Sequence, residues 1–390
     1  MKYCFKNNHL IDNLLIPYFP NFFTVDQARS IINSTSKHIS CSDLGLNSAY
    51  QFVDSGETGL KLLLLSFNLV ERSKIGVPAL ICESVIRAIL DSGFEPFILD
   101  IKDNFQVDFD PLKWASFGLS AVILPHLYGS LHPQTELITT WCKNNRVKII
   151  QDTAQSYGLQ FKDRAAIEFG NGGIYSFGPG KASTAAGGGI VWGLSHEIKY
   201  DKISMLMSIF KEAQAKNFLV ERTVGMTEQF KLNTLFTKFK EKGSYFSSYF
   251  MHGGLPLTSI QKTAAKVAVE AINNVSEKRK RRWQIFANNL NPSNFRLIED
   301  YSESMKFKYV FYIEQSETEC RRFLSYAHSH GIMIRQHTQQ IPKSVFSFIR
   351  KYGDLEFYQE NFYKLFEIST EASIPEDNFL KASKILNRYS

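Results

Sequence analysis

Between residues 57 and 193 the sequence alternates regularly between segments typical of helices and segments typical of buried strands. The helical segments are amphipathic or apolar stretches of about ten residues or more, whereas the strand segments are short apolar runs. Such alternation requires crossover connections, which produce a mainly parallel sheet covered by helices on both faces. We therefore predict an α/β fold with strands that begin near residues 75, 95, 119, 147, 172 and 187.

After residue 193 the pattern changes. Long polar and aromatic helical stretches are predicted over residues 195–250, and the next helix carries a basic run, EKRKRRW. From about Lys306 a strand, a helix and a second strand precede a closing helix pair, which suits a small α+β unit. We expect two domains: a large cofactor-binding α/β domain over residues 1–265 and a small C-terminal α+β domain over residues 266–390.

One segment, SFGPGKASTAAGGG at Ser176–Gly189, places a single lysine, Lys181, among five glycines. A P-loop requires G-x-x-x-x-G-K-[ST], but Tyr175 occupies the position of its first glycine and Ala182 follows the lysine. A dinucleotide fingerprint fails too, because Tyr175 stands where its third glycine belongs. The remaining chemistry is a Schiff base between Lys181 and an aldehyde cofactor, which suits a partly desolvated amine beside bare backbone.

Pyridoxal phosphate makes two further demands that the sequence can meet. Its ring nitrogen stays protonated only beside a carboxylate, and Asp152 follows the apolar run VKIIQ at the end where ligands bind in open α/β sheets. A capping or turn role is the alternative for this aspartate. The phosphate requires amides and hydroxyls at a helix N-terminus, which DSGETGLKLLLL supplies, and Ser176 adds a hydroxyl near Lys181.

These segments resemble the DegT type of pyridoxal-phosphate sugar aminotransferases, which belong to fold type I. That family has an aspartate, a glutamine three residues later, and a Ser-Phe segment with the lysine five residues after the serine and a Gly-Gly pair beyond. Here those positions are Asp152, Gln155, Ser176, Lys181 and Gly187–Gly189. SGETGL, VPALICESVIRAILDSGFEPFILDI and AVILPHLYG are also similar to the family, so the resemblance is collinear over roughly residues 50–194.

The resemblance implies a role for each matched residue. Lys181 would bind the cofactor and then move the proton at the substrate carbon, and Asp152 would hold the proton on the ring nitrogen. Gln155 would contact the ring oxygen. The phosphate would lie against Ser176 and the loop Gly56–Thr58, which includes Glu57.

The activity implied by the resemblance is amino transfer, with glutamate as the expected donor, to a keto group of a nucleotide-linked deoxysugar for a polysaccharide or glycoside. Family members that dehydrate sugars have a histidine at the position of Lys181, so the lysine favours transamination. The alternatives are the same chemistry on a keto-cyclitol or another small ketone, and a cofactor-fold binding protein without turnover. A homodimer is expected, because sites in this family form at a subunit interface.

Three positions depart from the family pattern. Glu57 stands where the phosphate loop usually has a threonine, and it places a carboxylate where an anion should bind unless its side chain points away. Cys82 occupies the ring-stacking position, which is commonly aromatic; the alternative for this thiol is packing. Gly254, Pro256 and Leu257 replace the Asn-x-Arg-Met segment that reaches the neighbouring subunit's site, so that contact is in doubt.

Two further residues, His126 and Tyr128, follow a predicted strand and either line the substrate cleft or shape a turn. His337 could approach the site from the small domain, although a surface position is the simpler interpretation.

The composition limits the other functions. The formal net charge of +7 fits a diphosphate-bearing substrate, and the basic run at Glu277–Trp283 is predicted to be a solvent-exposed helix face rather than a nucleic-acid site. Five scattered cysteines without paired spacing predict neither disulfides nor a metal site and fit a reducing compartment. The N-terminus lacks the features of a signal peptide and no apolar run could span a bilayer, so a cytoplasmic protein without membrane or nucleic-acid partners is expected.

Overall fold

The computed structural model describes residues 15–16, 23–34, 39–102, 104–178, 180–200, 208, 211–216, 218–219, 255–298, 308–336, 355–371 and 373–389. Most of the helical stretch predicted over residues 195–250 lies outside the described residues, as do Gly254 and His337.

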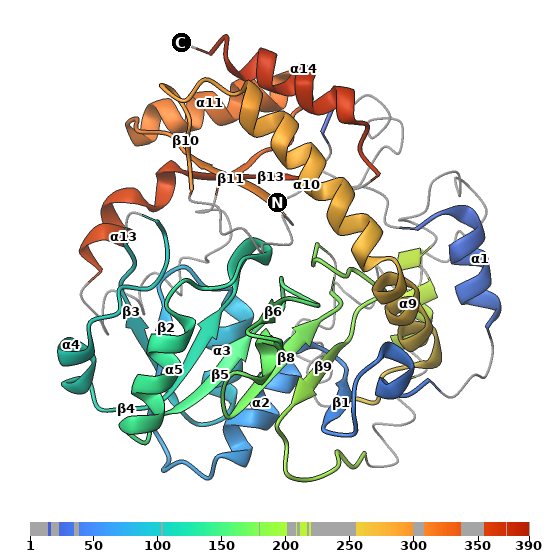
Figure 1. Cartoon of the computed structure of the whole chain (residues 1–390), viewed down its shortest axis with the longest axis vertical. Helices are drawn as coiled ribbons and strands as arrows, with labels where there is room; N and C mark the ends of the chain where they lie inside the picture. The colour runs from blue at the N-terminus through green and yellow to red at the C-terminus, as the bar shows by residue number, and fades with distance from the viewer. Residues whose placement is uncertain are drawn as a thin grey trace, which may run out of the picture.

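The larger of its two main sheets has seven strands in the order β1-β9-β8-β5-β4-β2-β3 (Figure 1). They are β1 (Tyr50–Val53), β2 (Lys74–Pro78), β3 (Glu95–Leu99), β4 (Leu119–Pro125), β5 (Lys148–Asp152), β8 (Gly172–Ser176) and β9 (Gly189–Trp192). The pairings from β3 to β8 are parallel, whereas β9 is antiparallel to both of its neighbours, β8 and β1. The predicted α/β fold with a mainly parallel sheet is therefore confirmed, with one reversed strand near its edge.

Helices cover both faces of this sheet because successive side chains of a strand point to opposite sides. The flanking helices are α2 (Gly56–Ser66), α3 (Glu83–Asp91), α4 (Pro111–Ala115) and α5 (Thr135–Asn144). Ile123 and Ile150 pack in one core with the apolar residues of α2 and α3. Their strand neighbours Val122 and Ile149 pack in a second core with those of α4 and α5.

A second sheet, antiparallel throughout, is built from the C-terminal part of the chain in the order β10-β11-β13-β12. Its strands and helices are β10 (Arg296–Leu297), β11 (Lys308–Tyr312), β12 (Arg335–Gln336), β13 (Leu365–Ser369), α10 (Ile272–Asn289), α11 (Glu317–Ser329) and α14 (Glu376–Leu386). Phe311 and Phe366 pack against α10, α11 and α14 on one face. Tyr312 and Leu365 belong instead to the core of the larger sheet, so the two sheets share an apolar contact.

The boundary between the two proposed domains falls inside a helix. α9 (Ser259–Glu270) contains residue 265 and leads directly into α10 (Figure 1). The helix α1 (Val25–Asn33) lies beside α9 (Figure 1). The division into domains of residues 1–265 and 266–390 remains a proposal.

Helix α2 is shorter than the apolar pattern suggests. The run Glu57–Glu71 predicts a helix, but α2 ends at Ser66 and Asn68 adopts a left-handed φ of 51°. Asparagine tolerates this conformation better than most residues, and a left-handed residue ends a helix.

The end of the chain contains a strand that the sequence did not predict. The closing helices are α13 (Glu356–Asn361) and α14, and β13 lies between them. Four of the five residues of β13 are buried, so its side chains show no alternation. A short run buried on both faces cannot be assigned by its periodicity alone.

The prediction that the basic run is a solvent-exposed face is wrong for two of its members. Arg279 and Arg282 are only 2% and 6% exposed, whereas Lys278 and Arg281 are exposed. Positions 276, 279, 282 and 286 of α10 are all buried, and this spacing places them on one face of the helix. None of the helices in the described parts of the chain combines the length and the apolar character needed to cross a membrane.

We expect Gly173→Ala to lower the free energy of unfolding by about 1–3 kcal/mol, because a side chain there overpacks the core. A Cβ at Gly173 in β8 would lie 2.4 Å from both Cγ1 and the carbonyl oxygen of Ile167. Gly178→Ala is the control, since its Cβ would meet only Ser176 Oγ, at 3.5 Å. Urea unfolding of both variants measures the difference, and equal stabilities would contradict this account of the packing.

Candidate active site

The predicted site residues come from strands that end side by side. Asp152, the last residue of β5, is paired with Pro125, the last residue of β4, and β8 lies parallel on the other side of β5. Gly189, the first residue of β9, is partnered with both Ser176 of β8 and Val53 of β1. The lysine segment after β8 and the turn before α2 therefore meet Asp152 at one edge of the sheet, as expected for ligand sites in open α/β sheets.

Lys181 and Asp152 form the charged centre of this edge. Asp152 is only 8% exposed, and its Oδ1 accepts a hydrogen bond from Ala154 N at 3.0 Å. Burial raises the pKa of the Asp152 carboxyl, while the positive charge of Lys181 and the Ala154 amide oppose that rise. Thr184 holds the lysine backbone: Lys181 N donates to Thr184 Oγ1 at 2.9 Å, and this hydroxyl donates to Lys181 O at 2.7 Å.

The start of α2 packs directly on Ser176. A Cβ added at Gly56 would lie 3.2 Å from Ser176 Cβ and 3.6 Å from its Oγ, so only glycine permits this approach without displacement. Ser55 caps the helix, with its Oγ accepting a hydrogen bond from Thr58 N at 3.1 Å. The first turn of a helix presents backbone N–H groups and a positive dipole end, which together favour an anion.

Glu57 turns its carboxylate toward α3. Its two oxygens accept hydrogen bonds from Arg87 Nε at 2.8 Å and Arg87 Nη2 at 2.7 Å. The Glu57 side chain is 7% exposed, and that of Arg87 is 40% exposed. This bidentate pair neutralises the negative charge that the sequence places in the phosphate loop and leaves the loop backbone to face the anion.

His126 is held inside the protein, where its ring contacts other protein groups. It is 1% exposed; His132 N donates to its Nδ1 at 3.0 Å, so its Nε2 carries the proton and donates to Gln151 Oε1 at 2.9 Å. Burial lowers the pKa of His126 to about 4, which keeps the ring neutral. With both ring nitrogens engaged, the geometry favours the turn role over the cleft role.

Gln155 and Tyr128 also meet each other. Gln155 Oε1 accepts a hydrogen bond from Tyr128 N at 2.7 Å, and Tyr128 has a left-handed φ of 59°. Gln155 thus stabilises a strained turn after β4 while remaining half-buried near the end of β5. A substrate contact by Tyr128, which is 9% exposed, stays a prediction.

Cys82 lies at the N-cap of α3 and is exposed, and its Sγ accepts a hydrogen bond from Ser84 Oγ at 3.3 Å. The alternative of a packed, buried thiol does not describe it. Its predicted contact with a cofactor ring remains a prediction.

The second sheet contributes charged residues that the sequence analysis missed. Lys308, at the start of β11, pairs with Glu367 of β13 at 2.5 Å, with both side chains largely buried. Burial lowers the pKa of Lys308, Glu367 opposes this, and the positive charges of Arg335 and Lys181 lower it further. Lys308 therefore lies within electrostatic reach of Lys181, although no local motif marks it.

A model of the DegT/DnrJ/EryC1/StrS aminotransferase family matches residues 49–357. The chain belongs to this family. GDP-perosamine synthase of Escherichia coli O157:H7 is 28% identical over 142 residues, which is 36% of this chain and 38% of that protein. The aligned stretch thus covers well under half of this curated relative.

Two solved structures have the same fold over nearly the whole chain. Helicobacter pylori PseC, an aminotransferase in the biosynthesis of pseudaminic acid, has a TM-score of 0.70 at 16% identity and covers 95% of this chain and 98% of its own. The PLP form of the sugar aminotransferase Spr1654 from Streptococcus pneumoniae has a TM-score of 0.67 at 17% identity, with coverages of 95% and 99%. At these identities the likeness shows the fold, and it confirms the prediction of fold type I.

Pyridoxal phosphate is the cofactor of the DegT/DnrJ/EryC1/StrS family, and the described residues fit it. Asp152 is a buried carboxylate whose pKa is raised by burial, so a protonated ring nitrogen beside it would stabilise its ionised form. The N-terminus of α2, packed closely on Ser176, suits the phosphate, and the Lys181 amine lies near Asp152. Asp152, the N-terminus of α2 with Ser176, and the lysine segment therefore all lie at the same edge of the sheet.

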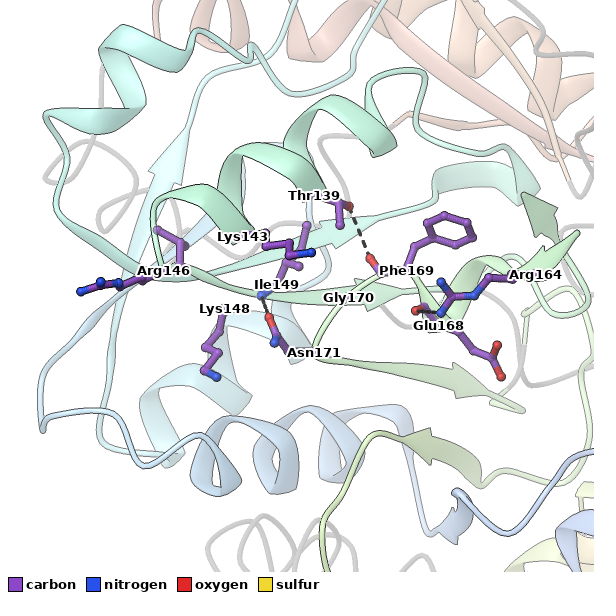
Figure 2. A pocket seen from close by; sticks show the side chains of 11 residues that line it. Thr139, Lys143, Arg146, Lys148, Ile149, Arg164, Glu168, Phe169, Gly170 and Asn171 are labelled. Carbon is purple, nitrogen blue, oxygen red and sulfur yellow. Dashed lines mark hydrogen bonds between the residues drawn. The ribbon is translucent and has the colours of Figure 1, made fainter. Parts of the chain in front are cut away.

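A separate pocket of about 540 Å³ lies at the opposite end of β5 (Figure 2). Lys148, the first residue of β5, lines it, whereas Asp152 is the last residue of that strand. Figure 2 shows that Arg146, Lys148 and Arg164 extend in different directions and do not converge on one point. None of the predicted site residues lines this pocket.

His126 should make the free energy of unfolding depend on pH. Its contribution should fall by about 3 kcal/mol as the pH falls from 6.5 to 4. The pKa of His126 is lowered from 6.5 to about 4. Between these two pH values the imidazole is protonated in the unfolded chain but stays neutral in the folded protein. Stability is therefore fully present above pH 6.5 and is lost toward pH 4. Denaturant titrations over this range measure the effect.

In these titrations His126→Asn, whose carboxamide oxygen takes the place of Nδ1, should flatten the slope, while a substitution of the exposed His330 should not. An unchanged slope in the His126 variant would be evidence against a neutral, buried ring.

Arg87→Ala should weaken the binding of pyridoxal phosphate by about tenfold or more, because the Glu57 carboxylate loses its partner beside the phosphate. The double variant Glu57→Thr with Arg87→Ala should recover most of this affinity. Glu83→Gln is the matched control, since Glu83 approaches Arg87 only to 3.7 Å and its side chain is 41% exposed. Titrations followed by visible absorbance give the dissociation constants; equal affinities in all variants would show that Arg87 does not serve this loop.

Proposed function

We propose that this protein is a pyridoxal-phosphate-dependent aminotransferase that uses Lys181 to move an amino group from a donor, glutamate on the family resemblance, to a keto group of a nucleotide-linked deoxysugar. The observation that carries the proposal is that Lys181 lies within electrostatic reach of the buried carboxylate of Asp152, at the carboxyl ends of the parallel strands. The family match over residues 49–357 supports the reaction class.

Each residue has a role that follows from its position. Bound pyridoxal phosphate would supply the electron sink that stabilises negative charge at the substrate carbon. Asp152 would hold a proton on the ring nitrogen, because a buried carboxylate binds a cation strongly in a site of low polarity. Lys181 Nζ would remove and return the proton at the substrate carbon, and the α2 N-terminus with Ser176 would hold the phosphate in place.

The lysine supports transamination over dehydration. An amine can both bond to an aldehyde and carry a proton, whereas the histidine found at this position in sugar dehydratases can only carry the proton. Thr184, which bonds to both backbone groups of Lys181, fixes the origin of that side chain.

A nucleotide-linked sugar is the substrate class that the comparisons support. GDP-perosamine synthase is named for a nucleotide-linked sugar, and the match to it covers part of the chain. The net charge of +7 is compatible with a diphosphate, and Lys308 of the second sheet lies within electrostatic reach of Lys181. A small ketone without a nucleotide is the alternative, and the same product assay distinguishes the two.

The oligomeric state and the location of the protein belong to the same proposal. We propose a cytoplasmic homodimer: the family resemblance implies the dimer, and the scattered cysteines fit a reducing compartment. Pro256 and Leu257 still stand where the family has a segment that reaches the neighbouring site, so we propose that each subunit relies on its own α2 N-terminus for the phosphate.

Lys181→Ala should abolish the visible absorption that wild-type protein gains with pyridoxal phosphate and should lower kcat by about 10²–10⁴-fold, since the proton carrier is lost. Lys199→Ala, which changes an exposed lysine, is the control. Products formed from glutamate and a panel of keto-sugar nucleotides and simple ketones are identified by mass spectrometry. A colourless wild-type protein that binds no cofactor would refute the proposal and favour a binding protein without turnover.

A further inference from the structure

The basic run of α10 contains a buried arginine that joins three separate segments. Arg279 is 2% exposed. Its Nη1 donates to Ala182 O at 2.7 Å, and its Nη2 donates to Glu371 Oε2 at 2.6 Å. Ala182 follows Lys181 directly, and Glu371 lies just beyond β13 in the second sheet.

The geometry points to Arg279 as a positioning residue for Lys181, an inference that rests on the proposed function of that lysine. Through one guanidinium, the carbonyl next to the lysine is tied to α10 and to the end of β13. A planar guanidinium donates in fixed directions, so it sets the orientation of the Ala182 peptide as well as its distance.

The rest of the lysine segment is held by a hydrogen bond within the segment and by one from α9. Ala185 N donates to Phe177 O at 2.9 Å, and Gln261 Nε2 donates to Ala186 O at 3.1 Å. At the Lys181 end the Thr184 hydroxyl closes a local turn. The bond from Arg279 to Ala182 O ties this end of the segment to α10 and, through Glu371, to the end of β13.

Burying the charged guanidinium costs free energy, so Arg279 needs its hydrogen-bond partners to remain buried. A buried charge is stable only when it is paired and hydrogen-bonded, and Glu371 is itself only 6% exposed. A shift of α10 or of the segment around Glu371 would therefore displace the Ala182 carbonyl with it, because the hydrogen bonds of Arg279 would be kept. Arg282, one turn away, is anchored differently: its Nε donates to Ile374 O at 2.7 Å.

The test compares Arg279→Gln and Arg279→Lys with the control Arg281→Gln, whose parent side chain is 72% exposed. Arg279→Gln should lower kcat/KM by roughly 100-fold, as expected for a misplaced catalytic group. It should also speed hydrogen exchange of the Ala185 amide in cofactor-free protein. Arg279→Lys keeps the positive charge but loses the planar guanidinium and its two donor groups. Relative to Arg279→Gln, it should therefore recover more of the melting temperature than of kcat/KM.

Hydrogen exchange separates this inference from the proposed function. Lys181→Ala removes the proposed chemistry yet should leave exchange in the segment unchanged, so exchange reports on Arg279 even if the protein takes up no pyridoxal phosphate. If Arg279→Gln lowered only the melting temperature, with wild-type exchange and kcat/KM, Arg279 would be a general structural residue and the inference would be overturned. If Arg279→Gln did not fold, the same measurements would be made on Arg279→Lys, and wild-type exchange and kcat/KM in that variant would overturn the inference.

Discussion

The parallel pairing of β4, β5 and β8 is the constraint on which the rest of the structure depends. Because these strands run in one direction, their carboxyl ends place Asp152 and the lysine segment at a single edge. The reversed strand β9 then closes the arrangement by pairing Gly189 with both Ser176 and Val53, which brings the start of α2 against Ser176. A shift of one residue in β8 would turn its side chains to the other face and separate these groups.

Glu57 and Asp152, two buried carboxylates at the site, are compensated to different degrees. Glu57, which looks incompatible with a phosphate loop in the sequence, is neutralised by Arg87 from the next helix. Asp152 differs, because its pKa is raised and only partly opposed by Lys181 and the Ala154 amide. A buried carboxylate that is only partly compensated is a candidate partner for an added cation.

Much of the fold and of the candidate site could be predicted from the sequence, because local patterns encode them. The six predicted strands exist, since each is a short apolar run bounded by turn residues, and the family motif singled out Lys181 and Asp152. β13 was missed because burial on both faces leaves no alternation, and its place is set by pairing with β11 and β12. Lys308 was missed for a related reason, as its partner Glu367 lies in that same unpredicted strand.

The basic run shows where local interpretation fails in physical terms. A run of like charges usually faces water, yet helical geometry turns every third or fourth side chain to the same side, and one side of α10 faces the protein. Whether an arginine can be buried there depends on a carboxylate and a carbonyl that come from residues 371 and 182, both about ninety residues or more away in sequence. The sequence specifies the cation, but the tertiary fold decides that its partners include the peptide beside Lys181, and that is what turns a surface feature into part of the site.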